Sequence, residues 1–238
     1  MSCEALLTAA AQGLFPLEFD LNTARANPKS LVMSVRAYKI RPAQPADLAE
    51  LVALEQQCWL KPLQASAETI QRRLQVNPTG QLVVVLDDAV VGVIYSQRIN
   101  DVDGLSHHTM ASVEALHQDN GAIVQLLAVN IKPDSQQRGL GDELLEFMLQ
   151  YVGLMGVNSV VAVSLVKAGI KPSAMTLTDY LQYKDDRGFL IDPILRFHQA
   201  HGASLAGVIT DYRLTVNNEQ RAGIIIHYDL LKTPSSAC

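Results

Sequence analysis

The sequence predicts an α/β fold in which helices flank a mixed central β-sheet. Strand-like and helix-like segments alternate between residues 38 and 230, and such alternation is typical of a sheet covered by helices. Residues 159–165, SVVAVSL, form a nearly unbroken apolar run, which is expected of a strand buried on both faces. The chain has 238 residues, enough for one large domain with an extension.

The first half of this domain is expected to contain a strand, two helices and a hairpin. In order, these are a strand at 38–42, a helix that starts near residue 47, a helix at 67–74, and hairpin strands at 82–86 and 90–97. The first helix carries apolar residues at helical spacing. Residues 77–80, Asn-Pro-Thr-Gly, end the second helix, and Asp87-Asp88 form the hairpin turn. The polar residues 101–120 are expected to form a loop or broken helix beside the functional site.

The second half is expected to alternate strands and helices and to close with two strands. In order, these are a strand at 123–131, a helix at 142–149, a strand at 159–165, an extended connection at 166–190, a helix at 193–201, and strands at 204–213 and 223–230. Asp192 is a plausible N-cap of the last helix, and Pro193 suits its first position. Gly202 is expected to end that helix.

We expect three segments along the chain. Residues 1–35 do not follow the strand and helix pattern and are expected to form a linker or interdomain segment. Residues 36–232 form the globular domain, and residues 233–238 form a short tail. The unexplained first segment favours a piece of a larger protein over a complete one.

Composition disfavours several classes of function. The net charge is −5, so nucleic acid is not expected as a partner. No stretch approaches the roughly 20 apolar residues that span a bilayer, and the N-terminus lacks a secretory signal, so we expect a cytoplasmic protein with no membrane partner. The three cysteines are far apart in the sequence and are expected to be reduced thiols. We expect Cys58 to be a buried thiol, which is more common than a nucleophilic one. No ligand spacing supports a metal site.

The most informative motif is the turn at residues 136–141, Gln-Gln-Arg-Gly-Leu-Gly, between a strand and a helix. The first N–H groups of a helix have no intrahelical acceptor, and the helix dipole favours an anion there. Gly139 and Gly141 allow close backbone approach to a ligand, and Arg138 adds a permanent positive charge. The spacing differs from the dinucleotide fingerprint and from the P-loop. A plain structural turn is the alternative interpretation.

The turn resembles the Gln/Arg-x-x-Gly-x-Gly/Ala pyrophosphate loop of the GNAT superfamily of CoA-dependent acyltransferases, with Gln136, Gly139 and Gly141 at the matching positions. The preceding residues 126–133 look like the family's fourth strand, whose backbone binds pantetheine. The resemblance implies the GNAT fold, with an acyl-CoA site at splayed strands and a CoA thioester as the ligand. The residues it implies for CoA binding are Leu127, Val129, Gln136, Gln137, Arg138, Gly139, Leu140 and Gly141.

The last predicted helix departs from the family pattern. Most members carry a Tyr four residues before the glycine that ends this helix, and this Tyr protonates the leaving thiolate. Here that position is His198. An imidazole with an ordinary pKa near 6.5 can donate or accept a proton at neutral pH. A buried His satisfied by backbone is the structural alternative, and the same alternative is favoured for His201.

Three further residues are candidates for chemistry. Ser164 ends the buried strand that is expected to run parallel to the phosphate-turn strand, where ligands collect in open sheets. Arg213 could clamp a carboxylate with its planar guanidinium. Trp59, the only Trp, follows the first helix, and core packing is its alternative role.

Together, Trp59, Ser164, His198 and Arg213 resemble the site of GNAT-like domains in polyketide synthase loading modules of the curacin type, in which a Thr or Ser provides the hydroxyl. This resemblance covers roughly residues 38–230. It implies decarboxylation of malonyl-CoA, or of a malonyl carrier protein, to the acetyl thioester. Transfer of the acetyl group to an acyl carrier protein thiol would be a second activity in polyketide chain initiation.

The resemblance also suggests roles for the side chains. Ser164 and His198 would stabilise the enolate oxygen that forms when CO2 leaves, and a protonated His198 would also be placed to protonate the enolate carbon. Arg213 or Trp59 would orient the malonyl carboxylate.

Two other functions stay open. One is an acetyl-CoA-dependent N-acetyltransferase acting on a small amine, which would need a general base such as Glu55, Asp103 or Glu114. The other is a non-catalytic domain that binds CoA or a protein.

Overall fold

The structure is a computed structural model that describes residues 38–214 and 220–231. The predicted linker at 1–35 and the predicted tail at 233–238 lie outside these residues. The strands are β1 (Tyr38–Pro42), β2 (Leu82–Leu86), β3 (Ala89–Ile99), β4 (Ile123–Ile131), β5 (Ser159–Ser164), β6 (Ser204–Leu214) and β7 (Gln220–Asp229). The helices are α2 (Leu48–Cys58), α3 (Ala67–Val76), α4 (Leu140–Leu154), α5 (Leu177–Gln182) and α6 (Pro193–Ala200), with short 3-10 turns between the elements.

One mixed sheet holds the described strands in the order β1-β2-β3-β4-β5-β7-β6. Only β4 and β5 run parallel, and the other neighbours are antiparallel. The predicted α/β class and the mixed central sheet are therefore confirmed. The connection from β4 to β5 passes through α4, as a parallel pair requires.

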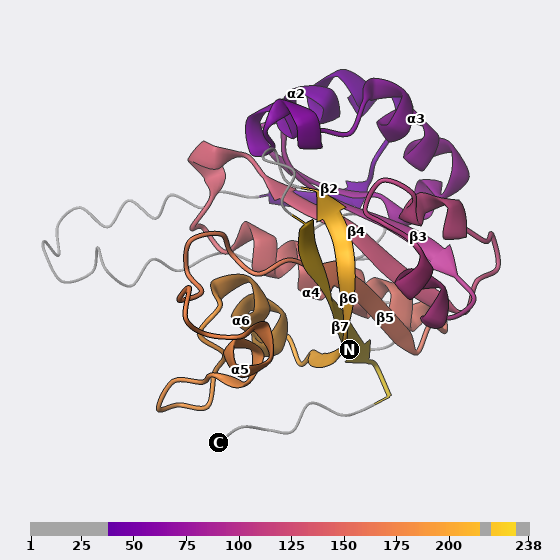
Figure 1. The fold of residues 1–238 in the computed structure, drawn as a ribbon. Helices are drawn as coiled ribbons and strands as arrows, with labels where there is room; N and C mark the ends of the chain where they lie inside the picture. The colour runs from indigo at the N-terminus through magenta and orange to yellow at the C-terminus, as the bar shows by residue number, and fades with distance from the viewer. Residues whose placement is uncertain (1–37, 215–219, 232–238) are drawn as a thin grey trace, which may run out of the picture.

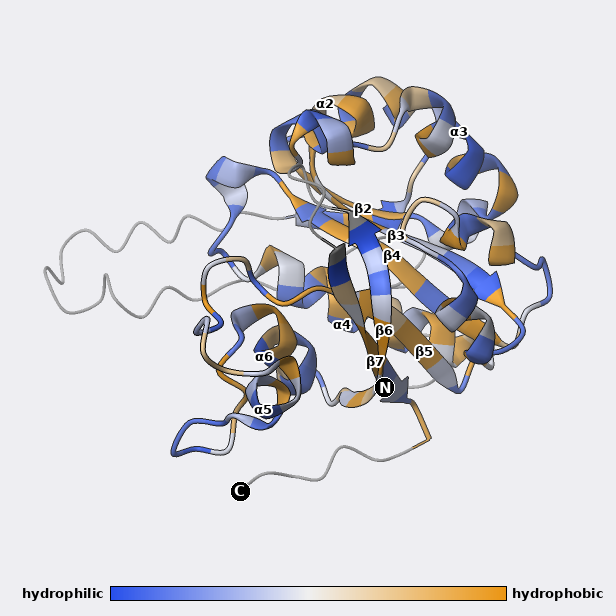
Figure 2. Cartoon of the chain, viewed as in Figure 1, coloured by the Kyte–Doolittle hydropathy of each residue, from blue (hydrophilic) through white to orange (hydrophobic). Residues whose placement is uncertain are grey.

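Helices cover the two faces of the sheet (Figure 1). The side chains of α4 and α6 pack on one face, in the cluster that includes Leu144, Leu195 and Ile226. α2 and α3 pack on the opposite face against Val93 and Tyr95. Hydrophobic residues run along the central strands, and hydrophilic residues mark the loops around α5 (Figure 2). Because helices cover both faces of the sheet, the side chains on both sides of β4 and β5 are largely apolar.

The structure corrects one predicted segment. Residues 166–190 were expected to be an extended connection, but α5 forms within them. Thr176 caps this helix by accepting a hydrogen bond from the Asp179 backbone N–H at 3.1 Å. A Ser or Thr followed three residues later by an acidic residue is a helix-start pattern, so the signal was present.

Helix α6 begins and ends as predicted. The Asp192 carboxylate accepts hydrogen bonds from the backbone N–H groups of Ile194 at 2.9 Å and Leu195 at 3.1 Å. Pro193 is the first helical residue, and Gly202 follows the helix with φ of 81°. This left-handed backbone ends the helix without a steric penalty at glycine.

Candidate active site

A gap opens between the parallel strands β4 and β5. Their pairing stops at Leu126 and Ala162, although β4 continues to Ile131 and β5 to Ser164. Beyond that point β4 stays paired with β3, and β5 stays paired with β7. The two strands therefore separate toward their carboxyl ends, which is where ligands bind in open α/β sheets.

A bulge at Leu127 marks the start of this gap. Tyr95 of β3 lies opposite Ala128 and Ser96 lies opposite Leu126, so Leu127 has no direct partner on β3. Such an extra residue bends its strand and disrupts the local ladder. Leu127 also lines a cavity on one side of the sheet. The bulge thus places strand backbone and cavity next to each other.

The predicted phosphate turn connects β4 to α4. Gly139 precedes the helix with φ of 76°, a left-handed conformation that suits glycine. A Cβ added to Gly141 would meet only Ile131 Cγ1, at 3.7 Å, so protein packing leaves room there. Gln136 and Arg138 bond the backbone carbonyls of Ile131 and Asp134 at 3.0 and 3.1 Å.

These features suit a pyrophosphate. The 15-residue helix α4 begins at Leu140, directly after the turn, and its first N–H groups point away from the helix. Gln137, Arg138 and Gln136 are exposed around it. The turn and the gap at β4 lie on one continuous segment of chain, so the residues present fit a CoA-type ligand.

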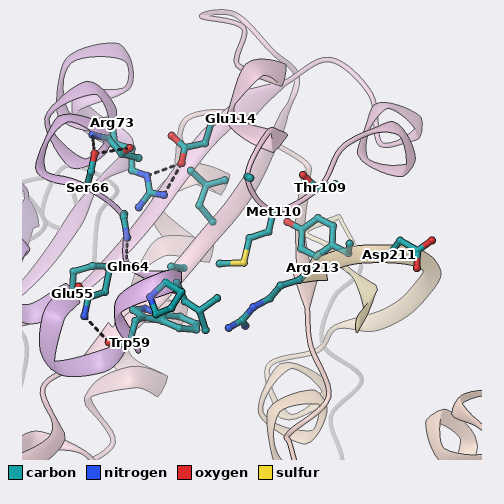
Figure 3. A pocket seen from close by; sticks show the side chains of 18 residues that line it. Glu55, Trp59, Gln64, Ser66, Arg73, Thr109, Met110, Glu114, Asp211 and Arg213 are labelled. Atoms are coloured by element: carbon teal, nitrogen blue, oxygen red, sulfur yellow. Dashed lines mark hydrogen bonds and ion pairs between the residues drawn. The ribbon is translucent and has the colours of Figure 1, made fainter. Parts of the chain in front are cut away.

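A cavity of about 520 Å³ lies on the α2 and α3 side of the sheet. It is lined by Trp59, Leu127 and Arg213, among others, and it does not include Ser164 or His198. Trp59 and Arg213 extend toward the same space from α2 and β6 (Figure 3). The guanidinium carbon of Arg213 lies 5.6 Å from the centroid of the Trp59 ring, within the range of a cation–π contact.

Arg213 reaches the cavity because β6 is irregular. Ile209 pairs with Gly223 and Arg213 pairs with Arg221, so β6 has extra residues between these two pairs. Asp211, one of them, has φ of 60°. Such bulges redirect side chains next to functional sites. The loop at 101–120 forms one wall of the cavity and is attached to β6 where the Met110 N–H donates to the Tyr212 carbonyl at 2.8 Å.

The guanidinium of Arg213 has no carboxylate partner among the described residues. Its Nε is buried and likewise unpaired in the described part of the chain. Burial lowers the pKa of Arg213, and the nearby Arg221 lowers it further. Arg213 nevertheless stays charged at neutral pH. Glu55 and Asp211 also line the cavity, but the Arg213 guanidinium pairs with neither of them and is free to bind an anion.

A buried network holds Trp59 in place. The Trp59 Nε1–H donates to Asn130 Oδ1 at 2.9 Å. Asn130 Nδ2 in turn donates to Glu55 at 2.7 Å, and the Ala65 N–H donates to the other carboxylate oxygen at 2.9 Å. This network was not predicted from the sequence, although Glu55 and Trp59 lie one helical turn apart.

The candidate general bases are placed differently from one another. Glu55 and Glu114 line the cavity, whereas Asp103 does not. Glu114 forms an ion pair with Arg73 at 2.6 Å (Figure 3). It forms a second ion pair with Arg72 at 2.8 Å. Both Glu55 and Glu114 therefore already bond to other groups. Four residues of the segment 101–120, which was expected to lie beside the functional site, line this cavity: Thr109, Met110, Ala111 and Glu114.

His198 and Ser164 lie on the α6 side of the sheet. Ser164 ends β5, which is parallel to β4 as expected. Within the described part of the chain, its hydroxyl makes a single long contact of 3.5 Å, to the Leu165 carbonyl. His198 is buried on α6 next to Tyr228, with 2.5 Å between Nδ1 and the phenol oxygen. Among the described residues, the hydrogen bond of the imidazole is made by Nδ1 and not by Nε2.

Burial changes the expected chemistry of His198. It lowers the pKa of His198 to about 4, with a smaller effect from His201. The imidazole is therefore neutral at pH 7, and the expectation that a protonated His198 delivers a proton does not fit this environment. A neutral imidazole can still donate one hydrogen bond. His201 has a structural contact, with Nδ1 2.7 Å from the Phe197 carbonyl.

The structure also bears on Cys58, the one cysteine among the described residues, and on possible metal and membrane binding. The Cys58 thiol donates to the Ile131 carbonyl at 3.4 Å, and burial raises its pKa, which does not favour a thiolate nucleophile. The described residues contain no cluster of three or more potential metal ligands. None of the described helices is both long and apolar enough to cross a bilayer.

Comparison with known proteins identifies similar domains. The chain is 44% identical to the loading GNATL domain of CurA from Lyngbya majuscula, with a TM-score of 0.77, covering 82% of this chain and 98% of that one. It is 37% identical to the GphF GNAT-like decarboxylase in complex with isobutyryl-CoA, with a TM-score of 0.73 and coverage of 81% and 99%.

More distant structures share the fold alone. The ribosomal-protein-S18-alanine N-acetyltransferase from Escherichia coli is 13% identical, with a TM-score of 0.55 and coverage of 84% and 99%. No curated protein sequence matches the chain significantly. The model of the acetyltransferase (GNAT) family matches residues 48–168. With this match and two similar domains of known structure, the chain belongs to the GNAT family.

Proposed function

We propose that this domain decarboxylates a malonyl thioester, carried by CoA or by an acyl carrier protein, to the acetyl thioester. The observation that carries the proposal is Arg213, a guanidinium without a carboxylate partner among the described residues, stacked on Trp59 beside the β4 bulge. A malonyl group has a free carboxylate that could complete this charge, whereas an acetyl group has none.

In this proposal the phosphate turn holds the pyrophosphate and the gap after Leu126 receives the pantetheine. The thioester would then lie between the cavity on one side and Ser164 with His198 on the other. Arg213 would hold the carboxylate, and Trp59 would form a wall beside it. The apolar neighbours Met110 and Leu127 would limit water around the carboxylate.

The side chains would act on the breaking C–C bond. Arg213 would turn the carboxylate out of the thioester plane, so that the bond to the α-carbon overlaps the carbonyl π system. When this bond breaks, CO2 leaves, and the electron pair of the broken bond forms an enolate with the thioester carbonyl. The Ser164 hydroxyl and a neutral His198 Nε2–H would donate to the enolate oxygen. A proton from water then adds to the α-carbon and gives the acetyl thioester.

The similar proteins support this reaction. The second structure is named a GNAT-like decarboxylase, and the first is the loading domain of CurA. We propose polyketide chain initiation as the setting, with the acetyl group passed to a carrier-protein thiol in a subsequent step. The neutral His198 in place of the usual Tyr also suits enolate stabilisation, because no strongly basic thiolate leaves in decarboxylation.

The test follows acyl groups by mass spectrometry. The full chain is incubated with malonyl-CoA in one reaction, with a malonylated carrier protein in another, and with acetyl-CoA plus small amines in a third. Acetyl thioester formed from either malonyl substrate supports the proposal. Inert malonyl substrates together with acetylated amine would establish the N-acetyltransferase instead, and no reaction in any arm would favour a binding domain.

Variants test the assigned residues. Ser164→Ala and His198→Ala each remove one proposed donor, and each should lower the decarboxylation rate about 100- to 1000-fold. CoA binding should change little, because neither residue lies in the phosphate turn. Normal decarboxylation by both variants would refute this assignment while leaving the activity itself established.

A further inference from the structure

His198 makes a buried contact with Tyr228, which has no role in the proposed decarboxylation steps. Tyr228 lies on β7, opposite Val160 of β5, and is 2% exposed. Its phenol oxygen is 2.5 Å from His198 Nδ1, and the two rings meet edge to face with centroids 6.0 Å apart. Two buried polar side chains from different elements are thus hydrogen-bonded directly to each other.

The backbone holds this pair firmly. The His198 carbonyl accepts hydrogen bonds from the N–H groups of both His201 and Ala203 at 3.1 Å, where α6 ends. Tyr228 lies on β7, which is paired on both sides, with β5 and with the edge strand β6. The ring of His198 therefore has little freedom to move away from the phenol.

The same register relates Tyr228 to Ser164. Tyr228 pairs with Val160 and Ile224 pairs with Ser164. Because side chains alternate along a strand, residues 160, 162 and 164 share one face with 224, 226 and 228. Tyr228 thus brings His198 to the sheet face that carries the Ser164 hydroxyl.

Hydrogen-bond satisfaction decides the direction of the His198–Tyr228 bond. Among the described residues, the Tyr228 hydroxyl has no partner other than His198 Nδ1. If Nδ1 carried the imidazole proton and donated it, the phenol proton would be buried without an acceptor, which is costly. If the phenol donates, the phenol proton and Nδ1 satisfy each other, and the imidazole proton lies on Nε2, which is not among the fully buried unpartnered atoms of the described residues.

We propose that Tyr228 is a positioning residue whose phenol O–H donates to His198 Nδ1 and holds the imidazole proton on Nε2. Burial raises the pKa of Tyr228 and lowers the pKa of His198, so the phenol stays protonated and the imidazole neutral. The Nε2–H is the donor that the enolate oxygen requires. The catalytic consequence rests on the proposed function, whereas the tautomer itself does not.

The direct test is the tautomer of His198. The protein is labelled with ¹⁵N in its six histidine rings, and two-bond ¹⁵N–¹H correlations report which nitrogen is protonated. A His198→Gln variant identifies the signal. We expect Nε2–H in the wild type and loss of this preference in Tyr228→Phe. A wild-type Nδ1–H tautomer, or an unchanged Nε2–H tautomer in Tyr228→Phe, would overturn the proposal.

Kinetics provide the second measurement. Tyr228→Phe should lower kcat for malonyl-CoA roughly 3- to 10-fold, the equivalent of one net hydrogen bond, with KM and CoA binding nearly unchanged. Tyr95→Phe is the matched control, since Tyr95 is also fully buried on a strand but its hydroxyl has no partner among the described residues. If the wild type proves inert toward malonyl-CoA, the proposed function fails, and the tautomer measurement still decides the role of Tyr228.

Discussion

Replacing Arg213 by Met tests whether the cavity recognises a carboxylate. The change keeps much of the side-chain length and removes the charge. Hydrogen bonds to charged groups contribute about 1.5 to 3 kcal/mol, and each 1.36 kcal/mol corresponds to a tenfold change in rate. Arg213 is only partly buried, so screening by solvent favours the lower end of this range. We therefore expect kcat/KM for malonyl-CoA to fall about 10- to 50-fold.

The assay compares two ligands. Initial rates with malonyl-CoA give kcat/KM, and calorimetry gives the affinity for acetyl-CoA, which lacks the carboxylate. Arg213→Met should leave acetyl-CoA binding nearly unchanged. Arg187→Met is the control for loss of an exposed positive charge. Equal losses for malonyl-CoA and acetyl-CoA would show that Arg213 does not recognise the carboxylate.

Three further predictions concern pH, packing and CoA. Because the pKa of His198 is lowered to about 4 in the folded state, His198 takes up a proton at a higher pH in the unfolded chain than in the folded protein. Urea unfolding should therefore show stability falling as pH drops from 6.5 toward 4, by up to roughly 3 kcal/mol; an equal loss in His198→Gln would contradict this. Asn130→Ala should lower the free energy of unfolding by about 2 to 3 kcal/mol, because it removes the hydrogen bonds to Trp59 and Glu55. It should also shift the emission wavelength of the single Trp, and unchanged emission would contradict the Trp59 network. Arg138→Ala should weaken CoA binding by calorimetry about tenfold and reduce its salt dependence, while unchanged affinity would place the phosphates elsewhere.

The fold could be predicted from the sequence because its strands and helices carry strong local signals. The apolar residues 159–165 and the caps at Asp192 and Gly202 each follow from local chemistry. Helix α5 was missed because its six residues lie in a long polar connection that contains Pro172. The Thr176 cap was a local signal that could have identified it.

The site was only partly predictable, because long-range pairing determines much of it. Counting from Gly202 identified His198, but Tyr228 lies 30 residues away and meets it only through the sheet. The lowered pKa of His198 likewise depends on burial by distant segments. The contact of Trp59 with Arg213 depends on an irregular β6 that no local sequence pattern indicates.

The most direct test of the central claim is CO2 release from malonyl-CoA labelled with ¹³C at its free carboxyl group. We expect one labelled CO2 for each acetyl-CoA that the wild-type protein forms, with both products strongly reduced in His198→Ala and Ser164→Ala. Intact malonyl-CoA and no labelled CO2, in a preparation that binds CoA, would contradict the claim that this GNAT domain is a decarboxylase.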